Sequence, residues 1–278
     1  MNAFLAERDR PLNLAHRGAS AYAPENTLAA FRLAAEMGVD GLEIDAKLSR
    51  DGAIVIMHDA TVDRTTNGSG RVSDLTLGQL KSLDAGSKFC SKFAGERVPI
   101  LDEVIDAVGD RLIVNIELTN YTSRRDGLEE RVVEFVNRNG LVHRVLISSF
   151  SPLSLRQVKR AAPHLVCGLL YPAGGAVFLR RAWLARIVPG LEARHPHFSL
   201  VDAASVRRFH RRGQKVHTWT VNEEADMRRV IAAGVDAIMT DKPHVLQRIV
   251  NPRASRDPRP FGSRAGGERI SGCGRFGS

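Results

Sequence analysis

Short apolar runs that end in a polar residue recur along this chain, and this pattern restricts the possible folds more than any other feature of the sequence. Between Leu12 and about Val250 these runs alternate with longer amphipathic stretches. Such alternation is typical of repeated βα units around a parallel sheet. We expect strands at residues 12–15, 41–45, 54–57, 112–117, 144–148, 165–170, 191–194, 215–220 and 237–240. With the run at 54–57 taken as a return strand, about eight parallel strands remain, which predicts a single α/β barrel.

Amphipathic segments with apolar residues at three- and four-residue spacing separate the expected strands and predict helices. The clearest are residues 27–37, 127–139, 153–161, 203–212 and 223–233. The rhythm breaks between Asp59 and Pro99, where turn-forming residues replace the apolar runs. We interpret this part as an insertion over one end of the barrel. Residues 1–250 are therefore expected to form one barrel domain with an insertion at about residues 59–99.

The chain after Val250 differs in composition from the rest. It is rich in Gly, Arg, Ser and Pro and carries six arginines against one aspartate and one glutamate. Because it has few apolar residues to bury, residues 251–278 are expected to form a disordered basic tail. This tail holds +4 of the net charge of +9. The remaining basic residues are scattered and show no aromatic-interleaved motif, so we expect no nucleic-acid partner.

The N-terminal residues lack the basic start and long apolar stretch of a secretory signal. No apolar run approaches the roughly 18 residues that a membrane span needs. We therefore expect no transmembrane segment and a cytoplasmic location. The three cysteines, Cys90, Cys167 and Cys273, lie far apart without metal-ligand or redox spacing, which favours isolated thiols.

Three carboxylates stand where apolar runs end, which is where a parallel barrel carries its chemistry. Glu43 and Asp45 are two residues apart, so both side chains point to one face of a strand, and Glu117 closes the run that begins at Leu112. Burial and mutual repulsion would raise their pKa values unless a cation lies between them. With no cysteine or close histidine pair nearby, the hard oxygen ligands favour Mg²⁺ or Ca²⁺. The alternative is that each carboxylate pairs with a nearby Lys or Arg.

Two histidines, His16 and His58, also follow apolar runs and are expected near the carboxylates. Imidazole exchanges a proton near neutral pH, as hydrolysis of a phosphodiester requires at both the attacking and the leaving oxygen. We expect one histidine to act as base and the other as acid. Arg17 offers a planar guanidinium that can hold two phosphate oxygens. The alternative for each histidine is a hydrogen-bonded core residue, and the alternative for Arg17 is a surface ion pair.

A series of motifs runs in a fixed order through residues 12–248. Its members are His16-Arg17-Gly18, Pro24-Glu25-Asn26-Thr27, Glu43-Ile44-Asp45, Asp51-Gly52, His58-Asp59, Asp63-Arg64-Thr65-Thr66-Asn67-Gly68, Leu83-Asp84-Ala85-Gly86, Val98-Pro99-Ile100-Leu101, Asn115-Ile116-Glu117, Ser148-Ser149-Phe150, Thr218-Trp219-Thr220-Val221-Asn222 and Thr240-Asp241-Lys242-Pro243. In this order they resemble the glycerophosphodiester phosphodiesterase family. Each motif alone is weak, whereas the ordered series is specific.

The resemblance implies a TIM (β/α)8 barrel of the phospholipase-C-like phosphodiesterase type, with a small insertion after the second strand. It implies hydrolysis of glycerophosphodiesters to sn-glycerol 3-phosphate and an alcohol, as part of lipid and glycerol metabolism. It assigns the site residues as follows: metal ligands Glu43, Asp45 and Glu117 for Mg²⁺ or Ca²⁺, catalytic His16 and His58, and substrate-binding Arg17 and Trp219. For Trp219 the alternative is an ordinary core tryptophan.

One departure from the family concerns Thr119. Many members have a lysine two residues after the third metal-ligating glutamate, on the same strand face, and this chain has Thr119 there. Lys47, two residues beyond Asp45, is a candidate substitute. The missing lysine leaves the preferred head group open.

Two other functions remain possible from the sequence. A lysophospholipase D-like activity would need an apolar surface for an acyl chain, and residues 177–188 are the candidate segment, with Phe178, Leu179, Trp183, Leu184 and Ile187. A non-catalytic barrel that binds phosphoglycerol groups would not need a proton-transfer pair, so His16 and His58 argue against it.

Overall fold

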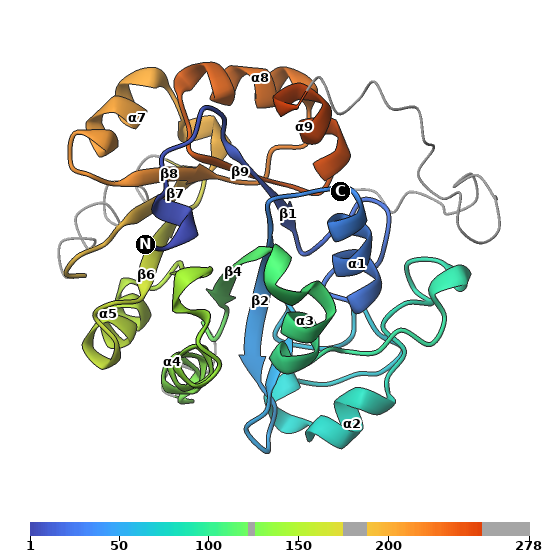
Figure 1. Cartoon of the computed structure of the whole chain (residues 1–278). Helices are drawn as coiled ribbons and strands as arrows, with labels where there is room; N and C mark the ends of the chain where they lie inside the picture. The colour runs from blue at the N-terminus through green and yellow to red at the C-terminus, as the bar shows by residue number, and fades with distance from the viewer. Residues whose placement is uncertain (122–125, 175–187, 252–278) are drawn as a thin grey trace.

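The strands of the computed structural model form one closed parallel barrel (Figure 1). The structure describes residues 1–121, 126–174 and 188–251. The sheet order is β1-β9-β8-β7-β6-β5-β4-β2, and β1 also pairs with β2, which closes the ring. Its parallel strands are β1 (Leu12–His16), β2 (Gly41–Leu48), β4 (Ile113–Leu118), β5 (Val145–Ser149), β6 (Val166–Tyr171), β7 (Ala193–Pro196), β8 (Lys215–Thr218) and β9 (Ala237–Thr240). The TIM barrel expected from the sequence is confirmed.

The return strand β3 (Ile54–Ile56) pairs with β2 in the antiparallel sense, with Ala46 opposite Ile56. Because β2 and β3 belong to one hairpin, the turn at residues 49–53 reverses the chain and brings it back to the barrel. The next residues, Met57 and His58, therefore lie beside the carboxyl half of β2, where the backbone N–H of Met57 donates to the carbonyl of Asp45.

Helices surround the barrel in Figure 1. They are α1 (Leu28–Glu36), α3 (Leu101–Val108), α4 (Leu128–Arg138), α5 (Pro152–Ala161), α7 (Ala203–His210), α8 (Glu224–Ala233) and α9 (Pro243–Val250). Local sequence sets their ends: the Thr27 hydroxyl accepts from the N–H of Ala30, and Ser151 caps α5 directly before Pro152.

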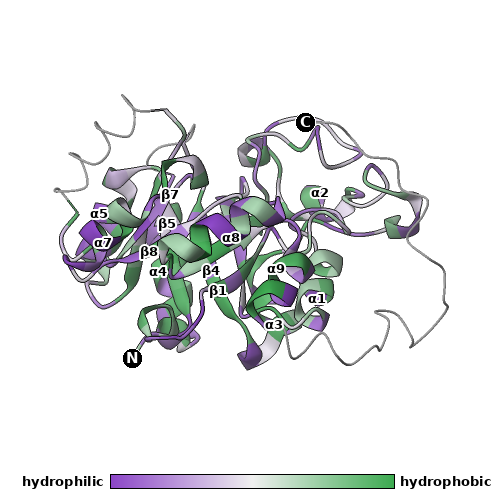
Figure 2. Cartoon of the chain, turned by 90° about the horizontal axis from the view of Figure 1, so that it is seen from above, coloured by the Kyte–Doolittle hydropathy of each residue, from purple (hydrophilic) through white to green (hydrophobic). Residues whose placement is uncertain are grey.

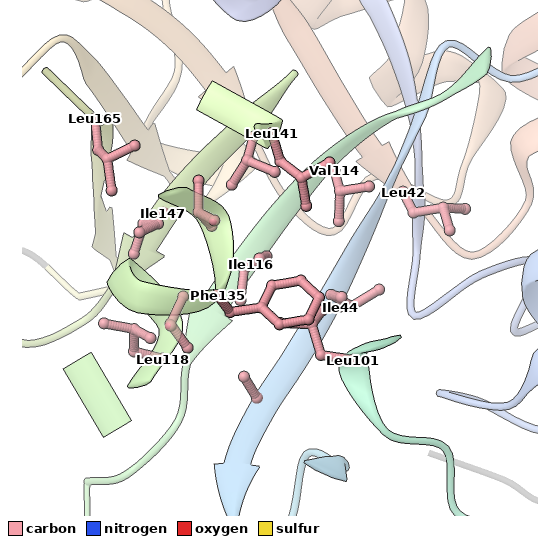
Figure 3. Packing of buried hydrophobic residues seen from close by; sticks show 14 of the residues in the cluster. Leu42, Ile44, Leu101, Val114, Ile116, Leu118, Phe135, Leu141, Ile147 and Leu165 are labelled. Atoms are coloured by element: carbon pink, nitrogen blue, oxygen red, sulfur yellow. The ribbon is translucent and has the colours of Figure 1, made fainter. Parts of the chain in front are cut away.

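Alternation along β2 and β4 sends apolar and polar side chains to opposite faces. Leu42 and Ile44 of β2 point outward and join Val114, Ile116 and Leu118 of β4 in the main apolar cluster. Figure 3 shows these side chains gathered with Phe135 of α4 and Leu101 of α3. The intervening residues face the barrel interior, which places carboxylates there without disturbing the packing of the helices.

The interior of the barrel is apolar at its amino-terminal end. Phe4, in the 3-10 turn Ala3–Leu5, packs there with Leu12, Leu14 and Ile113. The side-chain amide of Asn2 fixes this turn by donating to the carbonyls of Val142 and Val145. Figure 2 shows β4 mostly apolar and β7 mostly hydrophilic. A polar side chain reaches this end as well, because the buried ring of His217 lies 5.8 Å from the ring of Phe4.

The region expected to be an insertion contains the short helix α2 (Leu77–Ser82) and the 3-10 turns Val72–Asp74 and Ser91–Phe93. It has an apolar cluster of its own, in which Val62, Val72 and Leu80 pack with Val55 and Met57. Gly86 is required by a close approach, because a Cβ there would meet the carbonyl oxygen of Phe93 at 1.9 Å. The insertion is thus anchored to β3, beside the carboxyl end of β2.

No helix in the described residues is long and apolar enough to cross a membrane. Cys167 is a free, buried thiol as expected, but Cys90 is disulfide-bonded, so the expectation of isolated thiols is wrong for Cys90. Residues 252–278 of the expected tail and the apolar residues at 178–187 lie outside the described residues.

Candidate active site

Glu43, Asp45 and Glu117 meet at the carboxyl end of the barrel, and we call them the acidic cluster. Asp45 of β2 lies opposite Glu117 of β4 in the strand register, and Glu43 lies one pleat below. One carboxylate oxygen from each residue lies within 4.8 Å of the other two. All three residues are buried. The structure thus brings together the carboxylates that the sequence singled out.

The acidic cluster is electrostatically strained without a cation. Burial and the charges of Asp45 and Glu117 raise the pKa of Glu43 well above its ordinary value. Burial and Asp45 likewise raise the pKa of Glu117 to about 8, although the Tyr121 hydroxyl donates to Glu117 at 2.7 Å. Oε1 of Glu43 and Oδ1 of Asp45 are buried without a hydrogen-bond partner among the described residues. Orphaned anionic oxygens in an all-oxygen set fit a hard divalent cation such as Mg²⁺ or Ca²⁺.

Two residues with left-handed backbone conformations hold the acidic cluster in place. Asn26 has φ of 56° and donates from Nδ2 to Oδ2 of Asp45 at 2.8 Å. Arg17 also has φ of 56°, and its backbone N–H points at Glu43, 2.9 Å from the carbonyl and 3.2 Å from Oε2. Positive φ is uncommon outside glycine and concentrates at functional sites. The motifs that contain Arg17 and Asn26 in the sequence therefore position carboxylates of the acidic cluster.

An ion-pair network connects Arg17 to His58. Nη1 of Arg17 donates to Glu25 at 3.0 Å, and Arg64 of the insertion donates to both oxygens of Glu25 at 2.8 and 2.7 Å. Arg64 also donates to both oxygens of Asp59, at 2.6 and 3.1 Å, and Asp59 binds Nδ1 of His58 at 2.7 Å. The bond from Arg64 is the main cause that lowers the pKa of Asp59 to about 2. His58 is therefore oriented by a carboxylate that stays ionised.

His16 is oriented in the same way from the other side. Its Nδ1 lies 2.7 Å from Oδ1 of Asp241, and its Nε2 lies 3.8 Å from Oε2 of Glu43. Asp241 also accepts from Ser20 at 3.0 Å and from Asn222 at 2.6 Å. Burial would raise the pKa of Asp241, but the bond from His16 and these further donors outweigh it and lower the pKa to about 2. An anionic partner on Nδ1 fixes the tautomer and leaves Nε2 to face the acidic cluster.

Sequence reasoning missed the roles of Asp241 and Arg64. Asp241 follows the apolar run of β9, so the strand-end rule that identified Glu117 would also have identified it. Arg64 had no such signal, because it lies in the insertion and reaches Glu25 only through tertiary structure.

Trp219 lies in a row of aromatic rings at the carboxyl ends of the strands. Its ring is 5.3 Å from Phe150 and 5.3 Å from His197, in edge-to-face geometry, and Tyr121 lies 5.9 Å beyond Phe150. Nε1 of Trp219 donates to the carbonyl of His195 at 2.8 Å. Trp219 is only partly buried, and the aromatic row links it through Phe150 to Tyr121, whose hydroxyl donates to Glu117 of the acidic cluster.

This chain is similar in sequence and in structure to known phosphodiesterases. A model of the "Glycerophosphoryl diester phosphodiesterase family" matches residues 16–245. A glycerophosphodiester phosphodiesterase of Caldanaerobacter subterraneus is 45% identical over 242 residues, which cover 87% of this chain and 98% of that protein. One of Bacillus subtilis is 34% identical over 259 residues, 88% of each chain. The structure of an Oleispira antarctica phosphodiesterase in complex with the product sn-glycerol-3-phosphate superimposes with a TM-score of 0.74 at 33% identity, over 86% of this chain and 96% of that chain.

Proposed function

The chain belongs to the glycerophosphoryl diester phosphodiesterase family, and from this premise we propose that it hydrolyses glycerophosphodiesters to sn-glycerol 3-phosphate and an alcohol with the help of a divalent cation. The family and the enzyme class expected from the sequence are confirmed. The observation that carries the proposal is the acidic cluster on β2 and β4, which has carboxylate-anchored His16 and His58 on the neighbouring strand β1 and after β3. The product complex of the Oleispira antarctica relative supports the same reaction.

Glu43, Asp45 and Glu117 would hold the cation, Mg²⁺ or Ca²⁺, which when bound neutralises phosphoryl oxygens as a Lewis acid. The raised pKa values of Glu43 and Glu117 and the orphaned oxygens support this assignment, because a cation removes both costs. Arg17 would contact the phosphate with the part of its guanidinium that Glu25 and Asp45 leave open, since its Nε lies 3.1 Å from Oδ2 of Asp45. Because Glu25 takes one end of that group, Arg17 has less of its planar fork available to the phosphate than the sequence suggested.

The two histidines would move the protons. We assign His16 as the base that takes a proton from the attacking oxygen. We assign His58 as the acid that protonates the leaving oxygen. With Asp241 on Nδ1, Nε2 of His16 is the atom that accepts a proton, and with Asp59 on Nδ1, Nε2 of His58 is the atom that donates one. The exposures support this order, because the side chain of His58 is 40% exposed and that of His16 is 16% exposed. The alcohol must leave the site toward solvent, so the acid that protonates it is expected on the more exposed side, where His58 lies.

Trp219 and its aromatic neighbours would bind the carbon skeleton of the substrate by apolar contact. No observation favours the lysophospholipase D-like alternative, since its candidate apolar residues lie outside the described part of the chain. The anchored histidine pair argues against a non-catalytic barrel. A cytoplasmic location, a place in lipid and glycerol metabolism, the one-domain organisation of residues 1–250 with a disordered tail at 251–278, and the absence of nucleic-acid partners stay predictions.

A substrate panel tests the proposal. Purified protein is assayed on glycerophosphodiesters and on lysophospholipids, with a chelator and after Mg²⁺ or Ca²⁺ is added back. We expect turnover of glycerophosphodiesters that chelation abolishes and either cation restores. Preference for lysophospholipids would favour the alternative activity, and full turnover in excess chelator would refute the metal assignment.

A further inference from the structure

Lys47 is a buried lysine beside the acidic cluster. In the β2–β4 register Asp45 lies opposite Glu117, so Lys47 and Thr119, each two residues further on, lie opposite each other and on the same face. The ammonium of Lys47 donates to the carbonyl of Thr119 at 2.6 Å and to its hydroxyl at 2.8 Å. The hydroxyl in turn donates to the carbonyl of Ala46 at 2.9 Å. The two strands therefore present a fixed positive charge one pleat above two of the carboxylates.

This charge has no ion-pair partner among the described residues. Both hydrogen-bond acceptors of Lys47 belong to Thr119 and are neutral, although the carboxylates of Asp45, Glu117 and Asp59 act on it electrostatically from further away. The residue is 8% exposed. Burial of a charge costs several kcal/mol unless an opposite charge lies beside it, so an ammonium that contacts only neutral acceptors needs a reason.

A structural role alone does not supply that reason. The carbonyl and hydroxyl of Thr119 could be satisfied by a neutral donor such as an amide, which would avoid the cost of the charge. An anionic ligand at the mouth of the barrel would use the charge. The charge would also favour binding of this ligand, because a divalent cation does not fully offset the three carboxylates, which repel a phosphodiester.

From these contacts we propose that Lys47, held in place by Thr119, is a substrate-binding residue that contacts the anionic phosphate group. The inference rests on the proposed function and adds a residue to it.

The first variant is Lys47→Met, which keeps the length of the side chain and removes the charge. A hydrogen bond to a charged group contributes enough that its loss weakens binding about 10- to 100-fold. We expect the Kd of sn-glycerol 3-phosphate, measured by calorimetry, and the KM of a glycerophosphodiester to rise by this factor. The kcat should fall less than KM rises, and Lys47→Arg should keep most of the affinity.

The second variant exchanges the two residues. Lys47→Thr combined with Thr119→Lys puts the ammonium on β4 at the same level of the barrel, so the double variant should bind the product more tightly than Lys47→Thr alone by about tenfold. If Lys47 served only to connect the two strands by hydrogen bonds, the double variant would not be expected to regain affinity for the product.

Lys159→Met is the matched control. Lys159 is also buried, and it donates to the carbonyl of Leu165 at 2.7 Å and pairs with Glu192, next to the amino-terminal ends of β6 and β7. Its loss should lower the melting temperature and leave Kd and KM unchanged.

Two results would overturn the inference: an unchanged Kd for the product in Lys47→Met despite a lower melting temperature, or an exchanged variant that binds as weakly as Lys47→Thr. The failure of the proposed function looks different. In that case the unmodified protein would not hydrolyse any glycerophosphodiester, while the calorimetric comparison would still decide whether Lys47 binds the phosphate.

Discussion

Asp241 binds Nδ1 of His16 at 2.7 Å and thereby turns Nε2 of the same ring toward Glu43, 3.8 Å away. The contact follows from the closure of the barrel. In the β1–β9 register Ala15 lies opposite Thr240, so the next residues, His16 and Asp241, meet where the two strands end. A residue near the end of the barrel sequence thus orients one near its beginning.

Asp241→Asn tests this relationship. The amide keeps the shape but loses the charge that fixes the His16 tautomer, so we expect kcat to fall by about 10²-fold or more. Asp236→Asn is the control, because Asp236 binds His210 at 2.7 Å just before β9 begins, at the other end of the barrel. It should lower the melting temperature and leave kcat unchanged. Equal effects of the two substitutions on kcat would show that the Asp241 contact is only structural.

The metal-free protein should lose stability as pH rises from about 7 to 8. Folding raises the pKa of Glu117 from 4.5 to about 8, so between these values the folded state keeps a proton that the unfolded chain has lost, and stability falls as pH rises toward about 8. In this window the pKa values of Asp241, Glu25 and Asp59, near 2, and of the buried His217, near 4, contribute no change. The raised pKa of Glu43 acts in the same direction as that of Glu117, whereas burial lowers the pKa of Lys47 to about 8, which opposes part of the fall. Melting temperatures in chelator would check this.

Two comparisons isolate the effect of Glu117. In Glu117→Gln the fall between about pH 7 and 8 should be smaller than in the unmodified protein, because that position no longer titrates. Added Mg²⁺ should raise the melting temperature most at the higher pH, since the ionised carboxylates bind it better. A melting temperature of the Gln variant that follows the same pH profile would contradict the pKa assignment.

Arg64→Gln should impair turnover although Arg64 is remote from the acidic cluster. Arg64 joins Glu25 to Asp59, and without it Asp59 would hold His58 less firmly. We expect kcat to fall by about tenfold, with KM changing less. Arg228→Gln removes an arginine–carboxylate pair within α8, with Glu224, that has no contact with His58 or Asp59, and should have no effect. If Arg64→Gln also leaves kcat unchanged, the network does not position His58.

The sequence predicted most of the barrel because each strand is a separate apolar run with a polar end. β4 was expected at residues 112–117 and spans Ile113–Leu118. The same local rule identified Glu43, Asp45 and Glu117, whose side chains converge because parallel strands end at one edge. Contacts that depend on the insertion, such as Arg64 with Glu25, carry no periodic signal and needed the three-dimensional structure. The pairing of Lys47 with Thr119 needed the strand register, which the sequence alone did not give.

The central feature of the proposed mechanism is that His16 and His58 have different roles, one as base and one as acid. The direct measurement is kcat of His16→Ala and of His58→Ala on an alkyl glycerophosphodiester and on a nitrophenyl ester, with metal binding measured in parallel. On the alkyl substrate each variant should lose about 10²- to 10⁴-fold in kcat with the metal still bound. The nitrophenyl leaving group needs little protonation, so it should restore the turnover of His58→Ala and not that of His16→Ala. Losses of only a fewfold in both variants, or loss of the metal from both, would contradict the two-histidine mechanism.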